Sequence, residues 1–335
     1  HAARCIPIAY NLISKGYHVS FAVNHDLLAV LKPEFSEVTF VKFPSVKIRY
    51  SRKKLWLKLL FQIPKFFRSI FIEHQQLKKI VEKYQITVVI SDNRYGCFTS
   101  QTTNYFITHQ FSPKLPKHLQ RLDWIFKKII QSFIHRFDHC WIPDDPVLQL
   151  TGDLSKHPLK FNNISYIGIL SRFNFVKEKQ PVNMPDFDWL GMISGPEPQR
   201  SIFQQIVLSQ FKQSKKTCLL VCGQPWMETK TEKTSNVYVV PHLPSAQLKY
   251  TILHSKFIIC RSGYSSIMDL VSLQKTALLV PTPGQTEQEY LGKRMSEKKF
   301  FTTQHQDEIN LPEAEKFLDF DNSPVIRCFD ISSFL

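Results

Sequence analysis

Short apolar runs alternate with segments of helical periodicity along most of the chain. Ile6, Tyr10 and Ile13 share one face of a helix that stops at Gly16, and the β-rich run 18–23 follows at once. Further strands are predicted at 87–91, 104–109, 138–143, 164–168, 189–193, 217–222, 237–240, 257–260 and 277–280. Helices are predicted at 73–84, 199–212, 245–254 and 265–273. This alternation is typical of parallel sheets covered by helices.

The predicted elements form two series, separated by the polar segment 174–185 with its two prolines. A chain of 335 residues is long enough for two cores. We therefore predict an α/β protein of two Rossmann-like, doubly wound parallel-sheet domains that face a cleft, with domains at 1–178 and 179–335. The chain begins inside a predicted helix, so the strand that would precede His1 is expected to be missing.

Charge is distributed unevenly between the two predicted domains. Up to residue 180 there are 27 Lys and Arg against 12 Asp and Glu, whereas the 16 basic and 16 acidic residues that follow cancel. An anionic partner is therefore expected for the first domain only. The seven cysteines are odd in number and scattered, with no C-x-x-C pair, which is typical of a reducing compartment.

The basic residues of the first half interleave with aromatic ones. This pattern is densest in Lys47 to Arg68 and recurs between Lys114 and Arg136, and it favours binding at an anionic membrane surface. The alternative is two amphipathic helices whose aromatic residues are core. The longest apolar stretch, Leu55 to Ile72, is broken by Lys58, Pro64 and Arg68, so a membrane-spanning helix is not expected. Nucleic acid is a weaker prediction, because no nucleic-acid-binding signature accompanies the charge.

The sharpest local motif is Cys260-Arg-Ser-Gly-Tyr-Ser-Ser-Ile-Met-Asp269, in which a strand end leads into a helix. A helix start presents free N–H groups, and Gly263 lets a phosphate approach the main chain closely. Asp269 lies one to two turns further on, where a carboxylate could accept hydrogen bonds from ribose. The alternative interpretation is that Ser262 and Ser265 are helix caps and Gly263 a turn residue.

A second motif, Val280-Pro-Thr-Pro-Gly-Gln-Thr-Glu-Gln-Glu-Tyr-Leu291, leads from a strand end into another helix. Amide and carboxylate side chains at a helix start suit the hydroxyl groups of a sugar, which makes Gln285, Glu287 and Gln288 candidate ligands. The same residues would also form an ordinary capping box.

Together the two motifs resemble the donor site of GT-B glycosyltransferases of family 28, the type that adds N-acetylglucosamine to an undecaprenyl-linked precursor. The resemblance implies that Ser262 and Gly263 hold the diphosphate, that Asp269 binds ribose and that Gln288 contacts the donor sugar. Asp269 stands where the family usually has Glu, and Glu289 where a second Gln is common.

Other segments fit the same resemblance. The loop Val240 to Leu248, with His242 and Leu243, is similar to the loop that pairs with the base. Segment Ile193 to Arg200 is similar to the glycine loop that faces the nucleotide. The residues expected around the donor in these segments and in the strand ends are Ser194, Gly195, Arg200, Gly223 and Arg261. Residues 1–7 are similar to the end of the family's Gly-x-Gly-His-x-x-Arg loop, with His1 as its histidine.

Catalysis is expected to be inverting, without a bound metal and without a cofactor. Charge on the leaving group would be offset by the helix start at Gly263 and by Arg261 or Arg200. His1 and Asp92 are the candidate bases, because His and Asp commonly accept protons. Arg94 and His109, at the ends of strands in the first domain, are expected on the acceptor side of the cleft.

We therefore predict a hexosyltransferase that uses a nucleotide sugar, with UDP as the expected nucleotide, and a lipid-linked or other glycan acceptor. The expected location is the cytoplasm, at the inner face of the cell membrane. The alternatives are a nucleotide-sugar 2-epimerase of the same fold and a non-catalytic sugar-nucleotide binding subunit.

Overall fold

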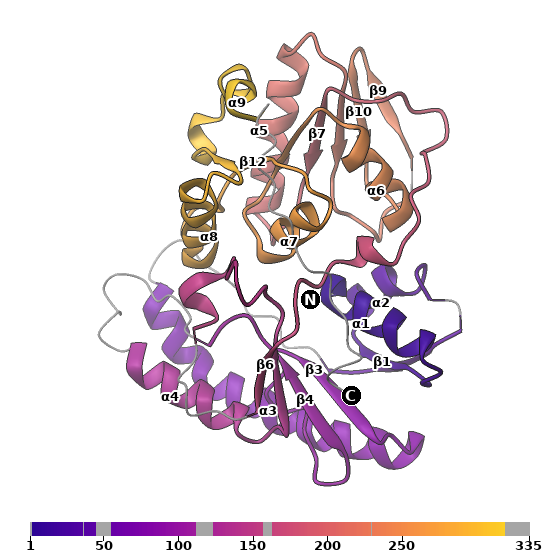
Figure 1. The fold of residues 1–335 in the computed structure, drawn as a ribbon, viewed down its shortest axis with the longest axis vertical. Coiled ribbons are helices and arrows are strands. Elements are labelled where there is room, and N and C mark those ends of the chain that lie inside the picture. The colour runs from indigo at the N-terminus through magenta and orange to yellow at the C-terminus, as the bar shows by residue number, and fades with distance from the viewer. Residues whose placement is uncertain are drawn as a thin grey trace.

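The computed structural model describes residues 2–35, 37–44, 55–111, 123–156, 163–228 and 230–318. These residues form two α/β halves, one above the other in Figure 1, each built on a parallel sheet. The prediction of a two-part, parallel-sheet α/β fold is therefore confirmed.

The first half contains a four-stranded parallel sheet and a separate parallel pair of strands. The large sheet has the order β3 (Val88–Asp92), β4 (Thr103–Ile107), β5 (His139–Ile142) and β6 (Ile164–Tyr166). The pair consists of β1 (Ser20–Val23) and β2 (Thr39–Lys42). The helices of this half are α1 (Ala2–Ser14), α2 (His25–Leu31), α3 (Leu55–Tyr84) and α4 (Asp123–Ile134), and η2 (Gly152–Leu154) is a short 3-10 helix.

Helices cover both faces of the four-stranded sheet. Ile8 of α1 packs with Tyr105, Ile107 and Trp141 on one face. On the other face, Ile134 of α4 packs with the alternate strand residues, Phe106, Cys140 and Ile142. This division follows from the period of two along a strand, and it makes the sheet doubly wound.

Helix α3 is longer than the periodicity predicted. The sequence predicts one helix at residues 73–84 and, as an alternative, a separate amphipathic helix within Lys47 to Arg68, but α3 runs as one helix from Leu55 through Pro64 to Tyr84. Within the described part of the chain, none of the helices combines the length and apolar character that a bilayer crossing requires.

The second half holds a seven-stranded sheet in which only the edge strand β9 is antiparallel. The strand order is β13 (Thr302–Thr303), β12 (Leu278–Leu279), β11 (Phe257–Cys260), β7 (Trp189–Met192), β8 (Cys218–Val221), β10 (Val237–Val240) and β9 (Glu232–Thr234). The helices are α5 (Gln199–Gln213), α6 (Ser245–His254), α7 (Tyr264–Ser272), α8 (Thr286–Glu297) and α9 (Leu311–Leu318), with η4 (Gln306–Glu308). Most of these elements match the predicted ranges to within two residues.

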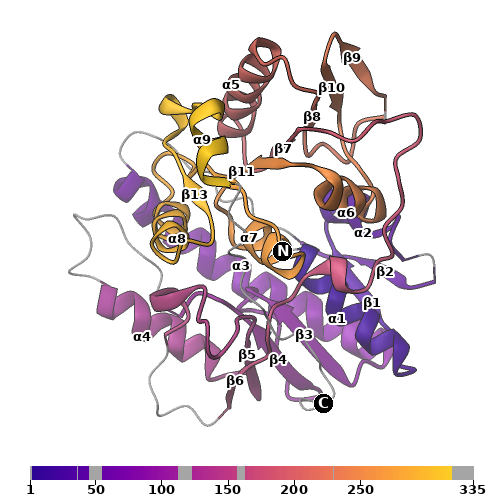
Figure 2. The same ribbon diagram turned by 45° about the horizontal axis from the view of Figure 1, so that its top comes forward.

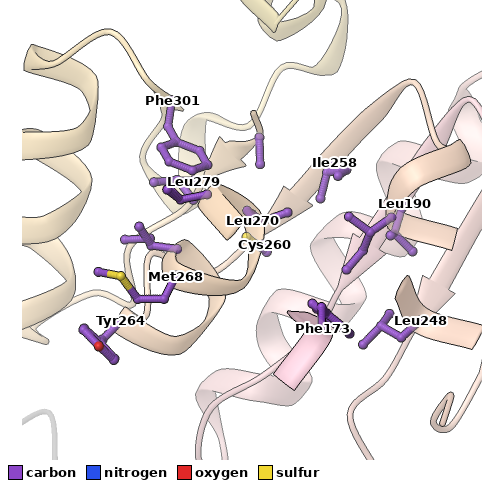
Figure 3. Close-up of a cluster of buried hydrophobic side chains, with 14 of the residues drawn as sticks. Phe173, Leu190, Leu248, Ile258, Cys260, Tyr264, Met268, Leu270, Leu279 and Phe301 are labelled. Carbon is purple, nitrogen blue, oxygen red and sulfur yellow. The ribbon is translucent and has the colours of Figure 1, made fainter. Parts of the chain in front are cut away.

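The central strands are apolar throughout because both of their faces are buried. Along β7, Trp189 belongs to one hydrophobic cluster and Leu190 to the other, on opposite faces of the sheet. Figure 3 shows the cluster around Leu190, which also contains Phe173. Phe173 comes from η3 (Arg172–Asn174), in the segment between the two halves, so this segment contributes to the second core.

Helices α7 and α8 lie on the side of the second half that faces the first (Figures 1 and 2). Contacts across this junction include two that tie α8 to the segment around η2. Arg294 donates to the carbonyl oxygens of Gln149 and Leu150, and the Asp153 N–H donates to the Tyr290 hydroxyl. The parallel sheets thus bring the carboxyl ends of β3, β4 and β11 towards one junction, where ligands of α/β proteins bind.

Candidate functional site

The start of α7 is an open helix N-terminus at the end of central strand β11. Gly263 is the N-cap residue of the helix and, as a glycine, supplies no side-chain hydrogen bond to its first N–H groups. Its φ of −75° is available to any residue, and a Cβ at Gly263 would meet none of the described atoms within 4 Å. The fold therefore does not require glycine here, whereas a phosphate approaching the backbone would.

Two neighbouring turns also depend on glycine. Gly195 follows β7 with a φ of +105°, and Gly223 follows β8 with a φ of +65°. A Cβ at Gly223 would lie 2.3 Å from the Ile193 carbonyl oxygen, so the loops after β7 and β8 approach each other closely. Ser194 and Gly195 are exposed beside this contact.

The start of α8 is held against the start of α7. The Ser262 hydroxyl donates to the Gln288 carbonyl oxygen at 2.8 Å, and the Gln288 side-chain oxygen accepts from the Thr282 N–H at 2.9 Å. Gln285 is the cap residue of α8. The two predicted motifs therefore lie together, although Ser262 and Gln288 use these groups to join the loops.

Arg261 lies inside the protein. Its guanidinium donates to the carbonyl oxygens of Val280, Pro281 and Gln199 and to the Gln306 side chain, and it stacks over the Phe203 ring at 4.0 Å. Burial lowers the pKa of Arg261 to about 10. These hydrogen bonds hold the guanidinium between strand ends, while its buried Nε has no hydrogen-bond partner among the described residues, and the predicted contact with a phosphate remains a prediction.

The other residues predicted around the nucleotide lie in the loops at the same edge. Arg200, on α5, is paired with Glu197 and lies 5.4 Å from the centre of the exposed Trp226 ring. Leu243 is buried after β10, and next to it burial and Arg172 lower the pKa of His242 to about 4. Ser265 is half-buried in the first turn of α7.

Asp269 is bound by the segment that joins the two halves. Ser171 donates to its carboxylate at 2.7 Å, and the Arg172 guanidinium lies 3.7 Å away. Burial raises the pKa of Asp269, and Arg172 and Ser171 oppose this shift. The carboxylate thus anchors the joining segment to α7, and its predicted contact with ribose remains a prediction.

A chain of charged and polar side chains crosses the junction between the two halves. Arg4 is paired with Asp92 at 2.7 Å and lies 2.5 Å from Nδ1 of His109. The other ring nitrogen of His109 lies 2.9 Å from the carboxylate of Glu287, at the start of α8. Tyr264 stacks on the His109 ring and donates from its hydroxyl to the Pro143 carbonyl oxygen.

The environment sets the protonation of this cluster. Burial lowers the pKa of His109, and the Arg4 charge acts in the same direction, although Glu287 and Asp92 oppose it. Burial favours the neutral form of Glu287, but hydrogen bonds and charge from His109 leave the pKa of this carboxyl below its ordinary value. At neutral pH the pair is therefore a neutral imidazole beside a carboxylate.

The structure brings Asp92 and His109 together but directs Arg94 elsewhere. Arg94 donates to the Pro44 carbonyl oxygen at 2.8 Å, stacks over Phe43 and lies 3.9 Å from Glu73. Its contacts are thus on the side of β2 and α3, and they do not support the predicted position on the acceptor side. The candidate base His1 lies outside the described residues.

Sequence reasoning gave no role to Arg4, although it is the arginine of the His-x-x-Arg pattern that begins at His1, and it missed Tyr264 and the pair Ser171 and Arg172. Arg4 precedes Ile8 by one helical turn and so shares the apolar face of α1, where a charged residue needs a buried partner. This signal could have identified Arg4. Nothing in the sequence connects Ser171 with Asp269, which is 98 residues away.

Comparisons with known proteins agree with this arrangement. Residues 193–314 match the model of the glycosyltransferase family 28 C-terminal domain. No curated protein sequence matches the chain significantly.

Several solved structures share the fold over nearly the whole chain. The glycosyltransferase SnogD from Streptomyces nogalater is 13% identical with a TM-score of 0.63, over 95% of this chain and 87% of that one. MnaA of S. aureus, solved with UDP, is 13% identical with a TM-score of 0.60, over 96% and 87%. MurG of Acinetobacter baumannii is 9% identical with a TM-score of 0.51, over 94% and 85%.

At these low sequence identities the structural similarity establishes only the fold. That fold is the GT-B fold of two Rossmann-like domains. The family match adds the kind of chemistry. Residues 193–314 match that family's C-terminal domain, and together with the fold this match indicates a glycosyltransferase of the GT-B class.

Proposed function

We propose that the protein transfers a hexose or N-acetylhexosamine from a nucleotide-diphosphate donor, UDP-linked, to an acceptor hydroxyl, with inversion and without a metal or cofactor. The observation that carries this proposal is Gly263, a cap glycine that the backbone does not need, at an open helix start. A diphosphate at this position would be stabilised by the N–H groups and the positive end of the helix macrodipole.

The reaction follows from that position. The acceptor oxygen attacks the anomeric carbon while the bond to the nucleoside diphosphate breaks, and the leaving diphosphate keeps its charge beside the start of α7. The acceptor proton goes to a base of the first half; of the two candidates, His1 and Asp92, the second is only 6% exposed and is paired with Arg4, so His1 is the base we propose. Asp92 ends β3 in the chain of contacts that leads through Arg4 and His109 to Glu287.

The acceptor is proposed to be lipid-linked and presented at an anionic membrane surface, at the inner face of the cell membrane. The part of Lys47 to Arg68 before residue 55 lies outside the described residues. The described remainder supports the proposal, because α3 and α4 adjoin through Phe67 and Phe133 and expose large apolar side chains. Phe71 is 64% exposed on α3, and Trp124 is 59% exposed on α4 beside Lys128. Exposed aromatic and cationic groups on one face suit a membrane interface.

The test is calorimetry with UDP, GDP and dTDP on the wild-type protein and on Gly263→Ala. We expect UDP to bind, and Gly263→Ala to weaken it at least tenfold, about 1.4 kcal/mol, while the midpoint of thermal unfolding barely changes. Gly16→Ala is the control for UDP binding alone, because its φ of +84° strains alanine and this variant is expected to unfold at a lower temperature, although a Cβ there meets none of the described atoms within 4 Å. Gly16 ends α1, so we expect that variant to bind UDP normally.

The outcomes separate the proposal from its alternatives. Failure of all three nucleotides to bind would contradict the transferase proposal. Binding of UDP with interconversion of UDP-N-acetylhexosamines in the absence of an acceptor would favour the epimerase. Binding with neither reaction, when lipid-linked and glycan acceptors are supplied, would favour the non-catalytic subunit.

A further inference from the structure

Both ring nitrogens of His109 contact charged side chains. Nδ1 lies 2.5 Å from the Arg4 guanidinium, and Nε2 lies 2.9 Å from the Glu287 carboxylate. The imidazole is 5% exposed, and Glu287 belongs to the other half of the molecule, 178 residues further along the chain. The contact therefore joins the end of β4 to the start of α8.

The two partners determine which nitrogen carries the proton. A guanidinium has only donors, so Nδ1 of His109 must accept the hydrogen bond from Arg4 and carries no proton. Neutral imidazole then has its proton on Nε2, which donates to Glu287. The contacts thus specify one tautomer, Nε2–H, with the hydrogen bond directed at the carboxylate.

The ring has little freedom to turn away from this geometry. Tyr264 stacks on it with 4.0 Å between ring centres, and the Tyr264 hydroxyl donates to Pro143. Arg4 is itself fixed by Asp92 at 2.7 Å and lies 5.3 Å from the Tyr264 ring centre. Groups from α1, β3 and α7 therefore orient the imidazole before any ligand binds.

Glu287 is the end of this chain that a ligand can reach. Its side chain is 35% exposed, while the side chains of Arg4 and Asp92 are only 3% and 6% exposed. It lies in the first turn of α8, and Ser262, next to Gly263, is bonded to the carbonyl oxygen of the adjoining residue Gln288. A carboxylate beside the diphosphate site is placed to accept hydrogen bonds from sugar hydroxyls.

We propose that His109 is a positioning residue that reaches across the domain junction and holds the Glu287 carboxylate in the orientation that binds the hydroxyl groups of the donor sugar. The inference rests on the proposed function, because it assigns the sugar subsite of that same donor site. It also gives the first domain a part in donor selection. Glu287 then has the orientation that binds the sugar only while the His109 contact between the two halves is formed.

Acid should weaken this arrangement. A second proton would go to Nδ1, which faces Arg4, and would turn its acceptor into a donor beside a cation. The charged or titratable groups around the ring are Arg4 on α1, Asp92 on β3, Tyr264 on α7 and Glu287 on α8. Burial and Arg4 lower the pKa of His109, so the neutral form persists below the ordinary histidine range.

Two substitutions separate the hydrogen bonds from the ring. His109→Phe keeps the stack on Tyr264 but removes both bonds. His109→Gln places an amide oxygen and an amide nitrogen near the two ring nitrogens, so it restores both bonds without a titrating group. His305→Gln, at an exposed residue of the second half, is the control for replacement of a histidine.

The first measurement is binding of UDP and of UDP-N-acetylglucosamine, UDP-N-acetylgalactosamine, UDP-glucose and UDP-galactose by calorimetry. For the sugar that wild-type protein prefers, His109→Phe should weaken binding about tenfold, as expected for loss of a charge-assisted hydrogen bond. Binding of UDP should change less than twofold, and His109→Gln should recover most of the loss. Equal or tighter binding of the sugar nucleotide by His109→Phe would overturn the proposal.

The second measurement does not depend on activity or on a ligand. Nitrogen-15 NMR of the imidazoles, with the His109 signal identified by its loss in His109→Gln, should show the Nε2–H tautomer at pH 7. An Nδ1–H tautomer or a cation at that pH would overturn the proposal even if the protein binds UDP. If no nucleotide binds, the proposed function fails, and the sugar-subsite role fails with it whichever tautomer is found.

Discussion

Ser171 donates a 2.7 Å hydrogen bond to Asp269, and this bond ties the segment between the two halves to α7, the helix that begins at the proposed diphosphate site. Arg172 adds an ion pair to the same carboxylate at 3.7 Å. The carboxylate that was expected to bind ribose is thus also a structural anchor.

Replacing Asp269 should therefore destabilise the protein. Asp269→Ala leaves the Arg172 guanidinium mostly buried without its carboxylate, and we expect a loss of about 3 kcal/mol in the free energy of unfolding, measured in urea. Ser171→Ala removes the hydrogen bond to Asp269 and the one that the Ser171 hydroxyl accepts from the Phe173 N–H, and it should cost about 1–2 kcal/mol. If Asp269→Ala weakens UDP binding and leaves stability unchanged, the anchoring role is wrong and ribose binding is favoured.

Arg261 should matter for stability more than for binding. Its guanidinium is 1% exposed and joins Val280, Pro281, Gln199 and Gln306, so Arg261→Ala leaves several buried acceptors unpaired. We expect a loss of about 3–5 kcal/mol by urea unfolding. Arg200→Ala, which removes a pairing with the exposed Glu197, should cost less than about 1 kcal/mol. A folded, stable Arg261→Ala protein that fails to bind UDP would restore the phosphate-binding role.

Stability should decline in acid because of His242. Burial and Arg172 lower its pKa to about 4 in the folded protein, whereas the unfolded chain has the ordinary value of 6.5. Below pH 6.5 the unfolded state binds a proton that the folded state does not, so stability is lost as pH falls from 6.5 towards 4. His242→Asn should flatten this part of the pH profile of urea unfolding, whereas His305→Gln should leave it unchanged. An identical profile for His242→Asn would contradict the assignment.

The exposed face of α3 and α4 should bind anionic vesicles. We expect each of the substitutions Lys127→Glu and Lys128→Glu to weaken vesicle binding by at least about fivefold. The reason is that each basic residue near an anionic surface contributes about 1 kcal/mol. Phe71→Ser should weaken vesicle binding as well, without loss of folding, because that ring is 64% exposed. Flotation with vesicles of phosphatidylglycerol measures both effects. Phe317→Ser, at a residue 57% exposed on α9, is the control, and equal binding by all variants would exclude this face.

The sequence predicted those parts of the fold that depend on local pattern. The apolar runs of β8, β10 and β11 are buried on both faces, so their composition alone marks them as strands of a parallel sheet. The separate pair β1 and β2 was only half predicted, because Thr39–Lys42 is partly exposed and lacks a continuous apolar run. Helix α3 was predicted too short because Pro64 reads as a helix break.

The candidate site was predictable only where a motif is continuous in sequence. Ser262, Gly263 and Gln288 were assigned from two adjacent motifs, and the structure holds those motifs together. The contact of His109 with Glu287 joins residues from two domains, and no local pattern encodes that distance. Arg261 was assigned to the phosphate from its charge, and its hydrogen bonds to four protein oxygens, which no local pattern encodes, leave that role a prediction.

The segment after β6 packs against both halves of the molecule. Phe173 packs in the core of the second half, Lys249 donates to the carbonyl oxygens of Phe173 and Val176, and the Lys179 N–H donates to Ala246. Phe175 of the same segment packs instead with the core of the first half and stacks on the Tyr10 ring of α1. A rotation that opened the cleft would therefore have to break one of these two sets of contacts.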